Sequence, residues 1–212
     1  MDLRLFIALE LPDTFIASLE KDLRDLKRSH PEFRWTGREN QHLTLAFLGS
    51  VPEQGVPLVT KALEQSVLKS KKDRRTLDDT YQQQTISTES INGIEIAAQG
   101  IYTFPPRKPA SVLAVGLGAG SEAVSLLAAH LERELLAIKD TASLKDFEAS
   151  QRPFTPHITV ARAGKSPIQL EAEERQVRLT ARGIVCSVAL VSSVLQRGGP
   201  VYTVQNRVSL EN

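Results

Sequence analysis

A four-residue pattern that occurs twice constrains this chain more than any other feature of its sequence. The pattern is His-x-Thr-x with apolar residues at x, and it stands at His42–Leu45 and again at His157–Val160. Each copy lies in a short apolar run typical of a β-strand, in which successive side chains point to opposite faces. The histidine and the threonine of each copy therefore share one face, and two such faces could line one cleft.

Two copies are harder to explain by chance than one. The chain has four histidines. From the threonine content, two of four histidines would have a threonine two residues later in about one chain in forty. The alternative interpretation is a pair of ordinary half-exposed strands, because threonine favours strands and histidine is often structural. The remaining two histidines fit the interpretation of histidine as a structural or surface residue. His30 precedes a proline at a helix end, and His130 lies off the apolar stripe of a helix, where we expect a surface residue.

Strict alternation along these strands makes two further predictions. In the first copy it places Leu43, Leu45 and Phe47 in the core. In the second copy it places Arg162 on the face opposite His157, so the guanidinium reaches the cleft only if the strand bends or ends there.

Hydrophobic periodicity predicts an alternation of strands and helices along the chain. The expected order is strand, helix, strand, helix, strand, strand, helix, strand, strand, strand, with strands at 3–9, 42–49, 93–101, 111–117, 157–162, 184–194 and 201–208 and helices at 12–29, from 52 onward and at 121–139. Each half holds a helix-rich stretch and one His-x-Thr strand. We therefore expect an α+β fold of two pseudo-symmetric lobes, with antiparallel sheets facing a central cleft and helices on the outer faces.

We expect residues 1–212 to form a single bilobal domain with a flexible insertion at about 69–90. The insertion begins with the basic run from Lys69 to Arg75 and continues with polar residues from Tyr81. Such a composition disfavours a packed element. Two interpretations stay open: a loop that contacts RNA, and a solvated connection.

Charge and cysteine content limit the class of protein. The net charge is only +1, from 26 basic and 25 acidic residues. This disfavours a protein that coats long RNA, but it allows one that holds an RNA end or a nucleotide in a local basic cleft. The single cysteine, Cys186, precludes an intramolecular disulfide and lies in an apolar run that favours a buried strand thiol. With no leader-like segment and no apolar stretch long enough to span a bilayer, we expect a cytoplasmic protein that does not contact membranes.

Two imidazoles suit acid–base chemistry on a phosphate ester. An ordinary imidazole pKa of about 6.5 lets one histidine be neutral and the other protonated near neutral pH. One can take a proton from water while the other gives a proton to the leaving oxygen. Threonine hydroxyls can donate hydrogen bonds to the phosphate oxygens. No zinc-ligand pattern or nucleophile motif accompanies either copy, so we expect neither a metal nor a cofactor.

Short segments spread over nearly the whole chain carry a family resemblance. They are Arg4–Leu9, Arg34-Trp35, His42–Gly49, Phe104-Pro105, Arg152–Arg162, Ser193 and Tyr202. Together they resemble the two-histidine (2H) phosphoesterases, and most closely the bacterial and archaeal RNA 2′,3′-cyclic phosphodiesterases, historically called 2′-5′ RNA ligases.

The resemblance implies a role for each polar position of the motifs. It implies that His42 is the general acid and His157 the general base, and that Thr44 and Thr159 hold the phosphate. A basic residue at the end of the second motif, here Arg162, would also bind the phosphate. The implied product is a 2′-phosphate, with the bond to the 3′ oxygen broken.

Phe6 is a candidate for contact with a nucleobase. It lies on the face of the first strand that the core does not claim by parity, where a base could stack on it at about 1–3 kcal/mol per stacked base. The alternative is packing under a helix.

Three functional hypotheses follow from these observations. The leading one is a monomeric, metal-independent phosphodiesterase that opens 2′,3′-cyclic phosphates on RNA ends or small cyclic nucleotides. The second is 2′-5′ ligation of RNA ends by the reverse reaction. The third is a non-catalytic module that binds RNA ends or nucleotides.

Overall fold

The computed structural model describes residues 1–81, 93–106, 109–197 and 199–211. In chain order the helices and strands are β1 (Asp2–Leu9), α1 (Asp13–Asp22), α2 (Arg24–Ser29), β2 (Arg34–Trp35), η1 (Arg38–Asn40), β3 (Leu43–Pro52), η2 (Glu53–Gly55), α3 (Val56–Tyr81), β4 (Ile94–Phe104), β5 (Val112–Leu117), α4 (Ser121–Ala137), β6 (His157–Arg162), η4 (Glu174–Gln176), β7 (Arg182–Val185), β8 (Ser187–Gln196) and β9 (Gly199–Ser209).

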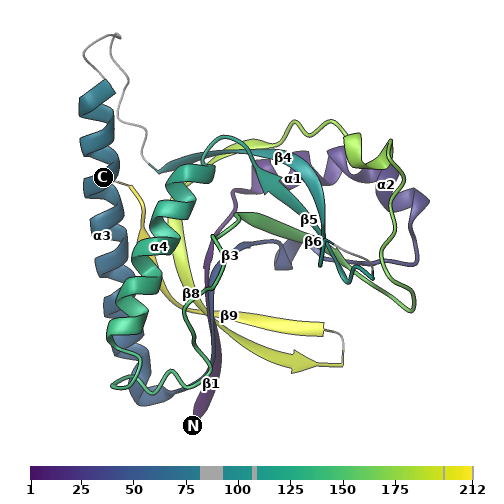
Figure 1. Ribbon diagram of the computed structural model, residues 1–212. Helices are drawn as coiled ribbons and strands as arrows, with labels where there is room; N and C mark the ends of the chain where they lie inside the picture. The colour runs from purple at the N-terminus through teal and green to yellow at the C-terminus, as the bar shows by residue number, and fades with distance from the viewer. Residues whose placement is uncertain (82–92, 107–108, 198, 212) are drawn as a thin grey trace.

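The strands form two antiparallel sheets, which confirms the predicted α+β class. The first, sheet A, has the order β3-β1-β8-β9, and the second, sheet B, has the order β2-β6-β5-β4-β7. Each sheet carries one His-x-Thr motif: β6 of sheet B contains the whole second motif, and β3 of sheet A begins at Leu43, directly after His42. Helices α3 and α4 pack side by side along the outside of the molecule, whereas α1 packs against β7 (Figure 1).

Sheet A buries apolar side chains on both of its faces. Along β1, Leu5, Ile7 and Leu9 belong to the main hydrophobic core, as alternation predicts. Phe6 and Ala8 point to the other face, where they join a second small cluster with residues of β8 and with Tyr202. Burial of this second face is therefore local and separate from the core.

Strand β3 does not alternate regularly, and Phe47 is consequently not in the core. Against β1, Ile7 pairs with Ala46 and Ala8 with Thr44, which leaves Leu45 as an extra residue. A second extra residue, Leu48, follows in the same way. Each insertion of this kind is a β-bulge and shifts the facing of the residues that follow. Phe47 is 68% exposed and Leu48 is fully buried, so the predicted core position of Phe47 is wrong.

Three further expectations need correction. The segment from 69 is helical as far as Tyr81, because α3 continues through it, and residues 82–90 of the expected insertion lie outside the described residues. His130 is buried and pairs with Asp73 of α3 at 2.9 Å, since α4 packs against α3 on that side. Cys186 is exposed because it occupies the junction between β7 and β8.

The bulges in β3 predict losses of stability of very different size for two adjacent residues. Leu48→Ala should lower the free energy of unfolding by about 2–5 kcal/mol, because it leaves a cavity in the core. Phe47→Ala should lower it by about 1 kcal/mol or less, because most of that ring is already exposed. Urea denaturation of both variants measures the difference. A regular strand with Phe47 inside would give the reverse order.

Candidate active site

The two motif histidines are held by the same local hydrogen bond. His42 Nδ1 lies 2.8 Å from the backbone oxygen of Asn40, and His157 Nδ1 lies 2.8 Å from the backbone oxygen of Thr155. A carbonyl oxygen can only accept, so Nδ1 is the protonated nitrogen in both rings. Nε2 is therefore left as the nitrogen that can exchange a proton with a substrate.

Each imidazole also packs beside a phenylalanine from its own sheet. The ring centroids of His42 and Phe6 are 4.9 Å apart, and those of His157 and Phe104 are 5.1 Å apart. Tyr202 meets His42 edge-on at 5.4 Å. Each ring is thus oriented by a backbone bond at one nitrogen and by an aromatic contact.

Both motif threonines can donate to an anion. Thr44 and Thr159 are half-buried on the same strand faces as their histidines, as predicted. Among the residues that the structure describes, neither hydroxyl has a hydrogen-bond partner. A half-buried hydroxyl of this kind has its donor available for a phosphate oxygen.

Arg162 faces the same side as His157 because β6 contains a bulge. Against β5, Leu113 pairs with Ala161 and Ala114 with Thr159, so Val160 is an extra residue. Val160 and Ala161 are both buried, and alternation resumes one residue late with Arg162 exposed. The strand irregularity that the sequence left open is therefore present, and it places the guanidinium on the face of the motif.

Arg162 also links the two lobes electrostatically. Strands β3 and β6 contact each other across the two sheets. Burial of His42 and, to a smaller extent, the positive charge of Arg162 lower the pKa of the imidazole, although the hydrogen bond to Asn40 opposes the shift. At Tyr202, burial raises the pKa while Arg162 and Arg4 act against it. The cation of the second motif thus acts on the histidine of the first, and Arg4 adds a second positive charge nearby.

A cavity of about 430 Å³ opens beside His42. It is lined by Phe6 and Tyr202 on the second face of sheet A, and also by Asp13 and Arg38 of α1 and η1. A volume of this size matches a small-molecule site. His157 does not line this cavity and belongs to sheet B; the electrostatic effect of Arg162 on His42 is what links the two motifs.

Phe6 lies on the face of β1 opposite the main core, as parity predicts, but its partners there were not predicted. The ring is only 4% exposed, because His42 and Tyr202 cover it. The exposed aromatic of this face is Phe47, whose ring lies 6.1 Å from that of Phe6. The sequence signal that could have identified Phe47 is its position, five residues after His42, which matches that of Arg162 after His157.

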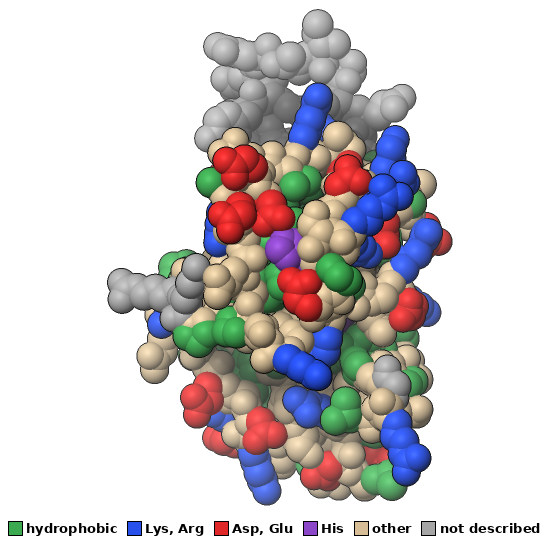
Figure 2. All heavy atoms as spheres, turned by 90° about the vertical axis from the view of Figure 1, so that its right-hand side faces the viewer, with side chains coloured by type: hydrophobic (Ala, Val, Ile, Leu, Met, Phe, Trp, Pro, Cys, Tyr) green, Lys and Arg blue, Asp and Glu red, His purple; other side chains and the backbone are tan. Residues whose placement is uncertain are grey.

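The face shown in Figure 2 carries intermixed acidic and basic side chains, and Lys and Arg side chains gather around the hollow that crosses its middle.

Within the described residues, no group of three or more His, Cys, Asp or Glu side chains is arranged to hold a metal ion. No helix in the same residues is both long enough and apolar enough to cross a membrane.

Comparison with known proteins gives consistent relatives over most of the chain. A family model described as the 2′-5′ RNA ligase superfamily matches residues 11–197. A protein of Aquifex aeolicus (strain VF5) named RNA 2′,3′-cyclic phosphodiesterase is 29% identical over 175 residues, which cover 81% of this chain and 78% of the relative. A Geobacillus stearothermophilus protein of the same name is 27% identical over 169 residues, which cover 79% of this chain but only 45% of the relative.

Solved structures share the fold over nearly the full length. The protein TT0787 of Thermus thermophilus superposes with a TM-score of 0.69 at 26% identity and covers 98% of both chains. Escherichia coli LigT in its apo form gives a TM-score of 0.64 at 20% identity, with 98% of this chain and 97% of LigT covered. The arrangement of two sheets is therefore that of LigT-like proteins.

The electrostatic effect of Arg162 on His42 predicts a shift in the titration of that histidine. Arg162→Gln should raise the pKa of His42, because a cation that disfavours the imidazolium is removed. Burial remains, so the pKa should stay below the ordinary histidine value. NMR titration of the imidazole protons measures the change, with His30 as the internal control that should not move. An unchanged His42 would show that Arg162 does not act on it.

Proposed function

This chain belongs to the 2′-5′ RNA ligase superfamily, and from that membership we propose that it hydrolyses 2′,3′-cyclic phosphates at RNA ends or on nucleotides to 2′-phosphates. The observation that carries the proposal is the matched pair of histidines, each with Nδ1 bound to a backbone carbonyl and Nε2 available. The two relatives named RNA 2′,3′-cyclic phosphodiesterase support the same activity.

The proposed reaction moves two protons and breaks one bond. His157 Nε2 takes a proton from water as the water oxygen attacks phosphorus. The bond between phosphorus and the 3′ oxygen breaks, and protonated His42 gives its Nε2 proton to that oxygen. The products are a 2′-phosphate and a 3′-hydroxyl. None of these steps requires a metal ion.

Thr44, Thr159 and Arg162 are proposed to hold the phosphate. The two hydroxyls donate to non-bridging oxygens, and the guanidinium offsets the charge that develops on them. In the free protein, burial and Arg162 keep the pKa of His42 low, which disfavours the acid form. A bound phosphate anion offsets Arg162 and adds a negative charge, so we propose that substrate binding itself helps protonate His42.

Ligation is the second candidate, because the family description names it. It requires the same groups with a ribose hydroxyl in place of water. Water is present in large excess and favours hydrolysis, so ligation should appear only as a minor product when cyclic-phosphate and 5′-hydroxyl ends are mixed.

The primary test is phosphorus-31 NMR of a short RNA that ends in a 2′,3′-cyclic phosphate, with excess EDTA present. We expect the cyclic signal to convert to that of a 2′-monophosphate. His42→Ala and His157→Ala should each lower turnover by at least about 100-fold, the usual contribution of a general acid or base. A folded variant with the wild-type rate would remove that histidine from the mechanism, and binding of the product without turnover by the wild type would favour a non-catalytic module.

The pH dependence tests the assignment of His42 as the acid. The basic limb of kcat/KM reports the free protein and that of kcat the complex. Because bound phosphate should raise the pKa of His42, the basic limb of kcat should lie at higher pH than that of kcat/KM. Coincident limbs, or the opposite order, would contradict substrate-assisted protonation of His42.

A further inference from the structure

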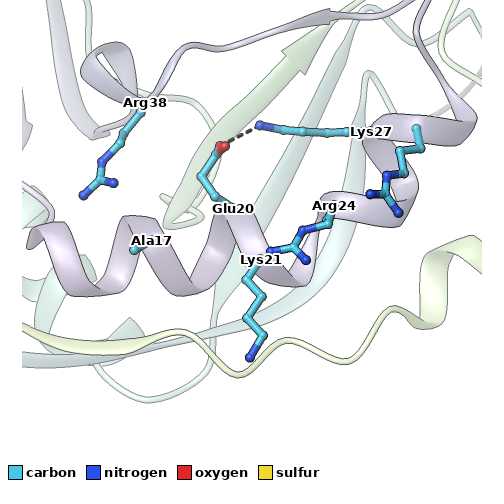
Figure 3. Close-up of a pocket in the computed structure, with 7 residues that line it drawn as sticks. Ala17, Glu20, Lys21, Arg24, Lys27 and Arg38 are labelled. Atoms are coloured by element: carbon cyan, nitrogen blue, oxygen red, sulfur yellow. Dashed lines mark hydrogen bonds and ion pairs between the residues drawn. The ribbon is translucent and has the colours of Figure 1, made fainter.

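A second cavity of about 510 Å³ lies on the outer side of α1 and α2. We call it the basic groove, because five of its seven lining residues are cationic: Lys21, Arg24, Lys27, Arg28 and Arg38. The other two are Ala17 and Glu20. Figure 3 shows Arg24 and Lys27 reaching from α2 toward α1, and Arg38 reaching toward α1 from the opposite side. Three segments of the chain therefore contribute positive charge to one concave surface.

Two of these cations carry charge that is not balanced locally. Lys27 bonds to Glu20 at 2.6 Å, while Arg38 pairs with Asp13 and Arg28 with Asp25 in solvent-exposed contacts. In the part of the chain that the structure describes, Lys21 and Arg24 have no acidic partner. Exposed ion pairs contribute little to stability, so a phosphate can displace the carboxylates from these arginines. The groove thus keeps a net positive charge in a chain whose total charge is only +1.

The basic groove adjoins the cavity beside His42. Arg38 lines both cavities. Gln41, which immediately precedes His42, donates from Nε2 to Glu20 at 2.6 Å and so connects the groove to the motif. A ligand that leaves the His42 cavity on this side meets the groove next.

Acidic side chains line the part of the His42 cavity that is nearest to α1 and η1, and they make this part unsuited to phosphate. Glu10, Asp13 and Glu39 line the His42 cavity on the side of α1 and η1. Carboxylates repel a phosphodiester but accept hydrogen bonds from ribose hydroxyls and from amino groups of bases. Along the surface, the proposed phosphate site at His42 is therefore followed by a nucleoside-sized cavity and then by a second cationic surface. Phosphates and nucleosides alternate in the same order along an RNA strand.

We propose that the basic groove binds the phosphodiester backbone of the nucleotides upstream of the cyclic phosphate, so that the preferred substrates are RNA oligonucleotides and not mononucleotides. This inference rests on the proposed function, because it takes His42 to mark the position of the terminal phosphate. The binding is electrostatic and independent of base sequence, since lysine and arginine contact phosphates without reading bases. An acidic protein partner is the alternative that the experiment below separates.

The test compares two substrates and two double variants. The substrates are adenosine 2′,3′-cyclic phosphate and a hexanucleotide with the same terminus. The test variant is Lys21→Gln with Arg24→Gln, which removes two exposed cations from helical positions that tolerate glutamine. The control is Lys61→Gln with Arg133→Gln, which removes two exposed cations from α3 and α4, on the opposite side of the molecule in Figure 1.

For the test variant we expect KM for the hexanucleotide to rise about tenfold. The slope of log KM against log salt should fall by about 1.4, because two phosphate contacts to a single strand are lost at about 0.7 each. Turnover of the mononucleotide should be unchanged, and the control variant should match the wild type on both substrates. An equal loss on both substrates, or no loss on either, would overturn the proposal. No loss on the hexanucleotide would leave an acidic protein as the ligand for these cations.

A binding measurement separates this inference from the proposed function. Fluorescence anisotropy with a labelled hexanucleotide that ends in a 2′-phosphate requires no turnover. If the wild type hydrolyses neither substrate but binds this RNA more tightly than the test variant does, RNA binding by the basic groove is supported and the proposed function is wrong. If both proteins bind this RNA with equal affinity and with the same salt dependence, the basic groove does not bind RNA, whatever the turnover.

Discussion

One extra residue in each motif strand, inserted directly after the threonine, decides which side chains face the cleft. It is Leu45 in β3 and Val160 in β6. Without it, the residue five positions after each histidine would point to the core, because alternation puts odd positions there. With it, Phe47 and Arg162 share the face of their histidines. A bulge often re-aims side chains beside a functional site, and here the same device occurs in both halves.

The two halves use this shared position for different chemistry. Sheet A presents an exposed aromatic ring, Phe47, next to the apolar cluster of Phe6 and Tyr202. Sheet B presents a cation, Arg162, on the same strand face as Thr159, whose hydroxyl has no hydrogen-bond partner in the described residues. Apolar surface on one wall and positive charge on the other match a nucleoside phosphate, whose base stacks and whose phosphate is anionic. Because Phe6 is covered by His42, Phe47 offers the larger surface to a base.

The sequence predicted what depends on local pattern and missed what depends on partners. Periodicity located most strands and helices, and parity correctly placed each threonine beside its histidine. The bulges were not predictable, because they arise from the register between two strands that are distant in sequence. His130 was misplaced for the same reason: its buried contact, Asp73, lies on another helix. The basic groove escaped notice because Arg38 joins Lys21 and Arg24 only after α1, α2 and η1 have packed. The catalytic roles and the single-domain organisation stay predictions.

Electrostatics constrains how a nearly neutral chain can bind the polyanion that we propose as its substrate. The total charge of +1 gives little long-range attraction, so positive charge must be concentrated where a phosphate binds. Arg162 provides such a charge at the motif, but at a cost to His42, whose pKa it lowers along with burial. The arginine that we propose to bind the phosphate therefore adds to the burial that disfavours the protonated form of His42 while the site is empty. Once the anion is bound, its charge opposes both effects. In the proposed mechanism, His42 therefore becomes an effective acid only when the substrate that needs its proton is in place.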